Sequence, residues 1–173
     1  LATRLHQHVY RNKRTQRGRF VTFWTREVPA AMYATRKQLL LSFGIFAGSM
    51  LIGIVSAHHD TLFPRLILGD GYVEMTLENI RKGEPMAVYG DSGEAGMFLR
   101  ITRNNVQVAL TCFVLGILGG FGTAYFLMYN GIMVGAFQYF FYQHGVLGES
   151  ARTIWVHGTL EISAIIVAGA AGL

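Results

Sequence analysis

Charge and cysteine are scarce in this chain of 173 residues. Charged residues make up 14% of it and hydrophobic residues 51%, whereas a soluble domain carries roughly 25% charged residues. With a positive mean hydropathy, this composition predicts membrane spans. The single cysteine, Cys112, excludes a disulfide framework or a cysteine metal site within one chain, and its apolar surroundings predict a small buried core residue.

Acidic residues are nearly missing from residues 1–38, where Glu27 is the single acidic residue and nine residues are Lys or Arg. Because basic residues that flank a span stay on the cytoplasmic side, the N-terminus is predicted to be cytoplasmic and the more acidic segment 58–105 to lie outside. No secretory signal is visible, since this stretch has no uninterrupted apolar core. A basic cluster directly before a span favours lipid headgroups over nucleic acid as its partner. The predicted membrane-surface residues are Arg11, Lys13, Arg14, Arg17 and Arg19.

Segment 1–38 is predicted to contain a cytoplasmic interfacial helix, because aromatic and polar residues alternate at helical spacing around Trp24. The alternative is an amphipathic helix packed on a soluble domain. Residues 39–57 carry no charge and are long enough to be the first transmembrane helix, since about 20 residues cross the hydrocarbon layer. Gly44 and Gly48 have the GxxxG spacing of close helix packing, a weak signal alone.

Segment 58–105 is predicted to be an outer loop with short helices. A helix is expected through Val73 and Glu78, which stands four residues before Lys82, with its end at Gly83. Asp91 and Glu94 have the spacing of a capping box. The run His58-His59-Asp60 suggests a metal site, but without a second set of ligands a solvated helix end is favoured.

No Asp, Glu, Lys or Arg occurs between Arg103 and Glu149, a length that suits two short crossings. The sequence Tyr129-Asn130-Gly131 is predicted to break it into a second transmembrane helix, 106–128, and a third helix, 131–147, which is short or re-entrant. Two further glycine pairs with four-residue spacing predict packing faces here, namely Gly116 with Gly120 and Gly131 with Gly135.

The last stretch, 153–173, is predicted to be a final membrane helix that other helices surround. His157 and Glu161 lie four residues apart, so they share one helix face, and an ionisable group at membrane depth normally faces the bundle interior. Trp155 marks the interface. Small residues predict close helix packing around this pair: Gly158, Ala164, Ala168 and Gly172.

Three roles are open for the His157 and Glu161 pair: a structural lock, a proton or ion relay, and catalysis, in falling order of preference. A zinc site needs a third protein ligand, and the sequence contains neither HExxH nor a nucleophile elbow. We therefore predict no catalytic residues, no metal and no cofactor.

The pattern of residues 130–172 resembles the stage II sporulation protein M family. Its N-G-x-x-x-G-A segment matches Asn130, Gly131, Gly135 and Ala136. Its H-G-x-x-E-…-A-G-A-A-G segment matches His157, Gly158, Glu161, Ala164, Ile165, Ala168, Gly169 and Gly172. The resemblance extends over essentially the whole chain. The sequence is similar to the branch of the family found in non-sporulating Gram-negative bacteria. The resemblance also implies that this is a fragment lacking both ends.

That family resemblance implies a multi-helix protein of the inner membrane without enzymatic activity. In endospore formers the named member is a scaffold that recruits two cell-wall hydrolases, and this sporulation role is not carried over here. The predicted fold is all-α, a polytopic bundle of 3–4 membrane helices. The predicted function is a membrane scaffold or assembly factor of the envelope, linked to peptidoglycan remodelling. The alternative is a permease subunit using Glu161. Expected partners are lipids, other envelope proteins and a second copy of the chain, with no nucleic acid.

Overall fold

The computed structural model describes residues 16–87 and 94–173, and all regular structure within these ranges is helical. The chain divides into two compact units, Leu1–Arg36 and Lys37–Leu173. Two groups of predicted residues lie outside the described part. They are the basic residues Arg11, Lys13 and Arg14, together with the side chain of Arg17, and Asp91 of the expected capping box.

The first unit contains one continuous helix made of three segments, α2 (Gln16–Thr22), η1 (Phe23–Glu27) and α3 (Val28–Ala34). The middle segment is a π-helical turn, in which the amide of Val28 donates to the carbonyl of Phe23, five residues back. No residue of η1 or α3 is buried.

Helix α4 (Arg36–His59) contains the predicted first span. By length and apolar composition it is the one helix of the described ranges that could cross a membrane; Gly158–Gly172 is a shorter apolar helical stretch. Large apolar side chains such as Leu40, Phe43 and Leu51 are exposed along it. Its buried face is a stripe of mostly small residues at helical spacing: Ser42, Phe46, Ser49, Gly53 and Ala57.

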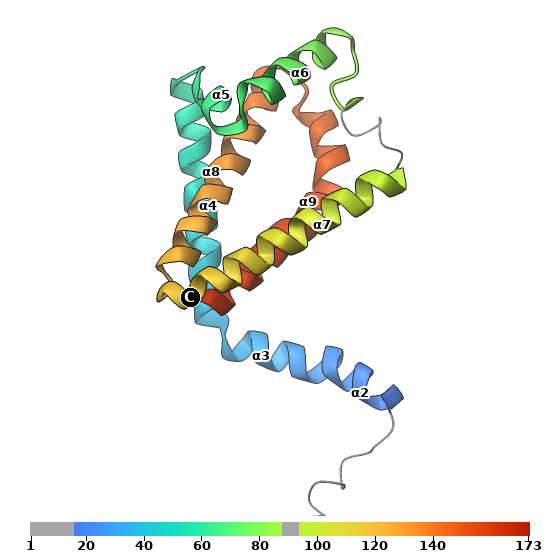
Figure 1. Ribbon diagram of the computed structural model, residues 1–173, viewed down its shortest axis with the longest axis vertical. Helices are drawn as coiled ribbons and strands as arrows, with labels where there is room; N and C mark the ends of the chain where they lie inside the picture. The colour runs from blue at the N-terminus through green and yellow to red at the C-terminus, as the bar shows by residue number, and fades with distance from the viewer. Residues whose placement is uncertain (1–15, 88–93) are drawn as a thin grey trace, which may run out of the picture. The chain divides into compact units, whose positions relative to one another are not determined.

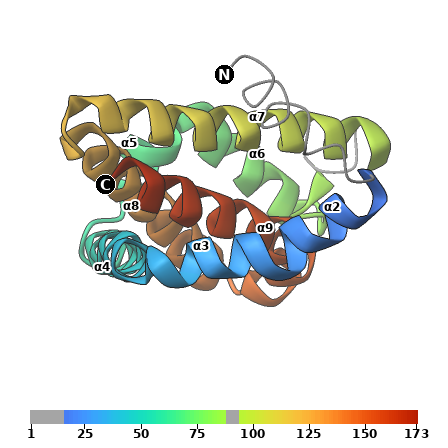
Figure 2. The ribbon, with the colours of Figure 1, turned by 90° about the horizontal axis from the view of Figure 1, so that it is seen from below.

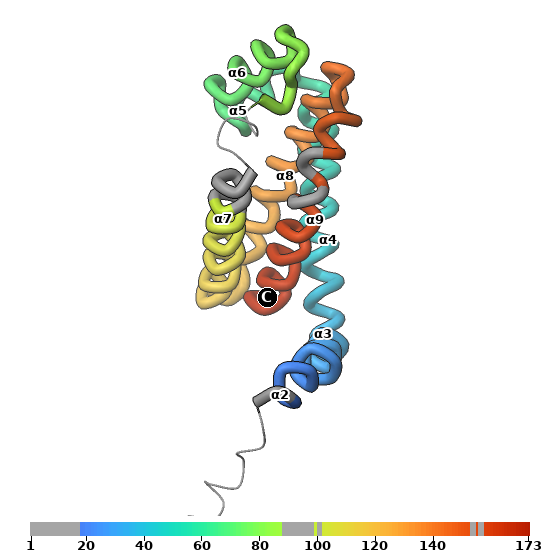
Figure 3. The backbone as a smooth tube through the Cα atoms, turned by 90° about the vertical axis from the view of Figure 1, so that its right-hand side faces the viewer, coloured from blue at the N-terminus to red at the C-terminus, as the bar shows by residue number. Residues whose placement is uncertain are grey.

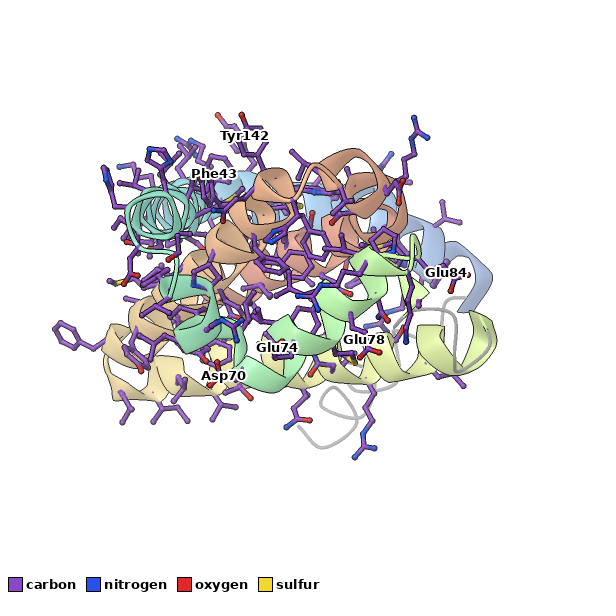
Figure 4. The ribbon with its side chains drawn as sticks, turned by 90° about the horizontal axis from the view of Figure 1, so that it is seen from above. Phe43, Asp70, Glu74, Glu78, Glu84 and Tyr142 are labelled. Atoms are coloured by element: carbon purple, nitrogen blue, oxygen red, sulfur yellow. The ribbon has the colours of Figure 1, made fainter. Side chains whose placement is uncertain are left out.

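Two short helices, α5 (Phe63–Leu68) and α6 (Asp70–Arg81), lie over one end of α8 (Phe121–Gln143), as Figure 1 shows. Val73 of α6 packs there with Phe140 and Phe141 of α8. Figure 4 shows Asp70, Glu74 and Glu78 along α6. As expected, Lys82 pairs with Glu78 at 2.8 Å, and the chain turns just after the helix at Gly83, whose φ is +79°.

The predicted helix break at Tyr129-Asn130-Gly131 is wrong, and so are the helix bounds 106–128 and 131–147 based on it. Helix α7 (Glu94–Val114) begins within the expected outer loop and continues into a 3-10 turn, η3 (Leu115–Leu118). The chain then reverses at Gly119 and Gly120, whose φ angles of +67° and +81° suit glycine. Asn130 stays inside α8 because its side-chain amide donates to the carbonyl of Phe126 at 2.8 Å.

Helix α9 (Leu147–Gly172) starts before the predicted residue 153 and includes both His157 and Glu161. It lies beside α7, and the two helices run in the same direction, as Figures 1 and 3 show. In Figure 2 the C-terminal ends of both helices lie on the left. Buried side chains of α4, α7, α8 and α9 form a core between these four helices: Phe46, Cys112, Leu127 and Ile165. The burial of Cys112 confirms the prediction made for it.

Candidate functional site

Helices α4 and α8 approach until their backbones touch, and glycine on α8 permits this. A Cβ added at Gly131 would lie 2.6 Å from the carbonyl oxygen of Phe46 and 2.8 Å from the Cβ of Ser49. A Cβ at Gly135 would overlap the carbonyl of Met50. Larger residues at these two positions would therefore force the helices apart.

The predicted glycine pair on α4 lies on the wrong face for this contact. Beyond the neighbouring residues and nearby backbone of α4 itself, no atom of the described residues lies within 4 Å of a Cβ built on Gly44 or Gly48, and both glycines are exposed. The glycine of α4 that meets α8 is Gly53, which would overlap the carbonyl of Ile132. In the sequence, this packing face of α4 is indicated by small residues four positions apart: Ser49, Gly53 and Ala57.

The turn η3, which continues α7, meets the C-terminal end of α9 at a second contact between backbones. A Cβ on Gly116 would lie 2.6 Å from the Cα of Gly172. The Thr123 hydroxyl donates to the carbonyl of Cys112 at 2.8 Å and so joins α8 to α7 beside Gly172. Gly120, predicted as the packing partner of Gly116, instead forms the turn into α8.

A buried hydroxyl joins α4 to α9. Ser42 donates to the carbonyl of Ile166 at 2.8 Å, and a Cβ on Gly169 would lie 2.6 Å from the Ser42 oxygen. Of the small residues predicted to pack on α9, Gly158 is buried and Ala168 is half-buried. Ala164 is exposed, because it lies off the stripe through Gly158, Ile165 and Gly172.

Glu161 is half-buried on that same stripe of α9. Among the described residues its carboxylate has no hydrogen-bond or ion-pair partner within the usual distances. The side chain of His157 lies outside the described part, so its pairing with Glu161 stays a prediction based on their spacing in one continuous helix.

Helical register identifies Asn105 as a polar residue at the level of Glu161, which the sequence analysis missed. About three turns before Gly116 and Gly172 stand Asn105 on α7 and Glu161 on α9. Because the two helices run side by side in the same direction, these residues lie at similar heights on the facing sides. Asn105 is half-buried, as Glu161 is. The register therefore places an amide and a carboxyl group at one level between the two helices.

A small pocket of about 160 Å³ lies between α5, α6 and the end of α8. His144 lines it, and the ring Nδ1 donates to the carbonyl of Phe140 at 2.8 Å, because a carbonyl oxygen can only accept. Arg65 also lines the pocket, but its guanidinium pairs with Glu74 at 2.7 Å and Asp70 at 3.5 Å. The hydrogen bond from Arg65 to Glu74 is the main cause that raises the pKa of this arginine. The remaining lining residues are Thr61, Pro64, Val73, Leu77, Phe140 and Gln143.

The histidines at the end of α4 make local contacts. His58 hydrogen-bonds to the Tyr139 hydroxyl of α8 at 2.6 Å, and the ring of His59 lies 5.1 Å from that of His58. Asp60 accepts from the amide of Leu62 at 2.8 Å. In residues 16–87 and 94–173, no three His, Cys, Asp or Glu residues are grouped closely enough to hold a metal ion.

Both tryptophans predicted to lie at the membrane interface are at least partly exposed. Trp24 in η1 is 56% exposed and Trp155 in α9 is 36% exposed. Their position relative to a lipid surface stays a prediction.

Comparison with protein families identifies the family of this chain. The family model for Stage II sporulation protein M matches residues 42–173. This range contains α4 from Ser42 onward, both glycine contacts and Glu161. Comparison with curated proteins and with solved structures gave no match.

Proposed function

The chain belongs to the stage II sporulation protein M family, and from that premise we propose that it is an integral membrane scaffold or assembly factor of the cell envelope. Membership of this family, together with the apolar helix α4, supports its assignment as a membrane protein. The proposal adds a multi-pass arrangement in the inner membrane with a cytoplasmic N-terminus and a link to peptidoglycan remodelling. Its partners are lipids, other envelope proteins and a second copy of the chain. The proposal includes no enzymatic activity, no cofactor and no nucleic acid.

The observation that best supports the proposal is the way the four long helices are joined. Glycines bring α4 against α8, and η3 after α7 against α9, at backbone contact. The hydroxyls of Ser42 and Thr123 add hydrogen bonds between helices. Such contacts resist sliding, because close packing and interhelical hydrogen bonds are the forces that associate helices in a membrane. A rigid frame of this kind suits a protein that holds others in place.

The test is co-purification after crosslinking in native membranes, with the parent protein and two variants. For a scaffold, Glu161→Gln should keep the partners of the parent, because the amide keeps the size of the side chain and can still hydrogen-bond. Gly135→Leu should lose them, because it separates α4 from α8. If no partner is crosslinked to the parent, or if Gly135→Leu keeps every partner, the scaffold proposal is wrong.

The half-buried Glu161 favours a second candidate function, that of a permease subunit in which this carboxyl group carries a proton or ion. Proteoliposomes that contain the parent should then show proton or solute flux, and Glu161→Gln should abolish it. Glu149→Gln is the matched control, because Glu149 is exposed at the start of the same helix. Flux that survives Glu161→Gln would exclude this role for Glu161.

A further inference from the structure

The helix of the first unit has an apolar face that its own unit does not cover. Phe20, Trp24 and Met32 are 70%, 56% and 44% exposed. The rings of Phe20 and Phe23 each make an edge contact with Trp24, with centroids 6.3 Å and 5.4 Å away. These aromatic rings therefore gather on one side of the helix, where they pack on one another.

The π-helical turn narrows this apolar face. Six apolar residues of this helix, Phe20, Phe23, Trp24, Val28, Ala31 and Met32, have offsets of 0, 3, 4, 8, 11 and 12 along the chain. In an uninterrupted α-helix, at about 100° per residue, these six would spread over about 180° of the helix circumference. An i→i+5 turn takes in one extra residue, so the effective offsets become 0, 3, 4, 7, 10 and 11. These offsets spread over about 120°, which is a narrower single face.

The threonine hydroxyls of this helix are satisfied within it, and most of the described charged side chains of the unit are positive. The hydroxyls of Thr22 and Thr25 donate to the carbonyls of Gly18 and Val21, at 2.8 Å and 2.7 Å. Arg36 donates to the carbonyl of Tyr33 at 3.0 Å, and its guanidinium lies 4.5 Å from the centre of the Tyr33 ring.

The described charged side chains of the unit are Arg19, Arg26, Arg36 and the single acid Glu27. A continuous apolar stripe on a helix with excess positive charge matches the chemistry of an anionic lipid surface.

We propose that Gln16–Ala34 lies on the surface of an anionic lipid bilayer, and that the π-helical turn aligns its two halves so that one apolar stripe enters the lipid. The covalent connection to α4, the helix able to cross a membrane, supports lipid over a soluble protein as the occupant. This inference rests on the chain being a membrane protein but not on its role as a scaffold. Its test can therefore fail while the scaffold proposal stands. Equally, the test of the scaffold proposal can fail while this inference stands.

The first experiment measures how closely Trp24 approaches lipid in the full chain. Trp155→Phe leaves Trp24 as the reporter, and the protein is reconstituted in vesicles of phosphatidylcholine with or without phosphatidylglycerol. We expect a blue-shifted emission that brominated lipid quenches when phosphatidylglycerol is present. Arg19→Glu with Arg26→Glu should lose most of this quenching, whereas Arg152→Glu, an exposed site in the second unit, should not. Equal quenching in both vesicle types, or none, would overturn the proposal, and none would point to a protein cover.

The second experiment tests the role of the turn. Removal of Thr25 takes out the extra residue and restores a regular α-helix with the same apolar face, so lipid quenching should persist. Insertion of one alanine after Thr25 should turn the second half by about 100°. In a chain with this insertion, a tryptophan introduced by Met32→Trp, with Trp24→Phe and Trp155→Phe, should lose its quenching by brominated lipid. In a second chain with the same insertion and Trp155→Phe alone, Trp24 should keep its quenching. Loss of quenching on removal of Thr25 would contradict the alignment role.

Discussion

At the scale of single residues, Glu161 and Asn105 form the most informative pair, because each is a half-buried polar group at one level between α7 and α9. We predict that they are energetically coupled. In a double-mutant cycle of Asn105→Ala and Glu161→Gln, the coupling energy should reach about 0.6 kcal/mol, the average for polar contacts between membrane helices. The measurement is the free energy of unfolding in a bilayer or bicelle.

Asn104 provides the matched control for that cycle. It is the neighbouring residue with the same side chain but is exposed, so Asn104→Ala and Glu161→Gln should be additive. Equal coupling for both asparagines would show that the interaction does not depend on the α7–α9 interface.

The Glu78 carboxyl group provides a second prediction at this scale. Its hydrogen bond with Lys82 lowers its pKa, and the charge of Lys82 adds to the effect. Because the pKa is lowered in the folded state, the ion pair stabilises α6 at pH values above the ordinary glutamate pKa. This stabilisation is lost as pH falls through the lowered pKa. An NMR titration should show that Lys82→Gln raises the pKa of Glu78.

The same titration with Arg81→Gln serves as the control. Arg81 lowers the pKa of Glu78 only through its charge, and it is the weakest of the causes. The shift on Arg81→Gln should therefore be smaller than the shift on Lys82→Gln. A larger shift would mean that the Glu78–Lys82 hydrogen bond is not the main cause.

At the scale of helices, two glycines that each belong to a pair with four-residue spacing are predicted to respond in opposite ways to substitution by alanine. Gly135→Ala should destabilise the protein by about 1–3 kcal/mol, because the new methyl group would overlap the Met50 carbonyl. Gly44→Ala should be neutral or stabilising by up to about 1 kcal/mol, because its site is open and alanine favours helix. Thermal unfolding in one detergent compares them, and equal destabilisation would contradict the observed α4–α8 contact.

These glycines also show what sequence spacing can predict. The four-residue repeat correctly indicated small residues on α8, since Gly131 and Gly135 both meet α4. It selected the wrong face of α4, because Gly44 and Gly48 have the same spacing as the true stripe through Ser49 and Gly53. Spacing defines a face but not its direction, and only the partner helix decides which face is covered.

The misplaced helix break has a similar physical cause. Asn-Gly favours a turn by local propensity, but Asn130 bonds back within α8 and Gly131 lies against α4, so tertiary packing overrides the local preference. The true reversal needs positive φ at two successive residues, and Gly119-Gly120 supplies both. The level of Asn105 with Glu161 could not be read from the sequence, because it depends on how α7 and α9 align.

At the scale of the whole second unit, the directions of the four long helices lead to a prediction about membrane topology. Helices α4 and α8 run in the same direction, since Phe46 meets Gly131, Met50 meets Gly135 and His58 meets Tyr139. Helices α7 and α9 share the opposite direction, because α8 reverses the chain after α7 and α9 reverses it after α8. If all four cross the membrane, the C-terminal ends of α4 and α8 lie on one side of it and η3 lies on the other side.

Cysteine labelling on intact cells tests this arrangement in a Cys112→Ala background. A membrane-impermeant maleimide should label Thr61→Cys and Gln143→Cys, because both sites are exposed near the ends that the basic N-terminal segment predicts to be outside. Ile117→Cys in η3, 83% exposed, should react only after the membrane is permeabilised. Labelling of all three from outside would exclude crossing by α7 and α8. Labelling of Ile117→Cys alone would keep four crossings but reverse the orientation, and would place the basic segment outside.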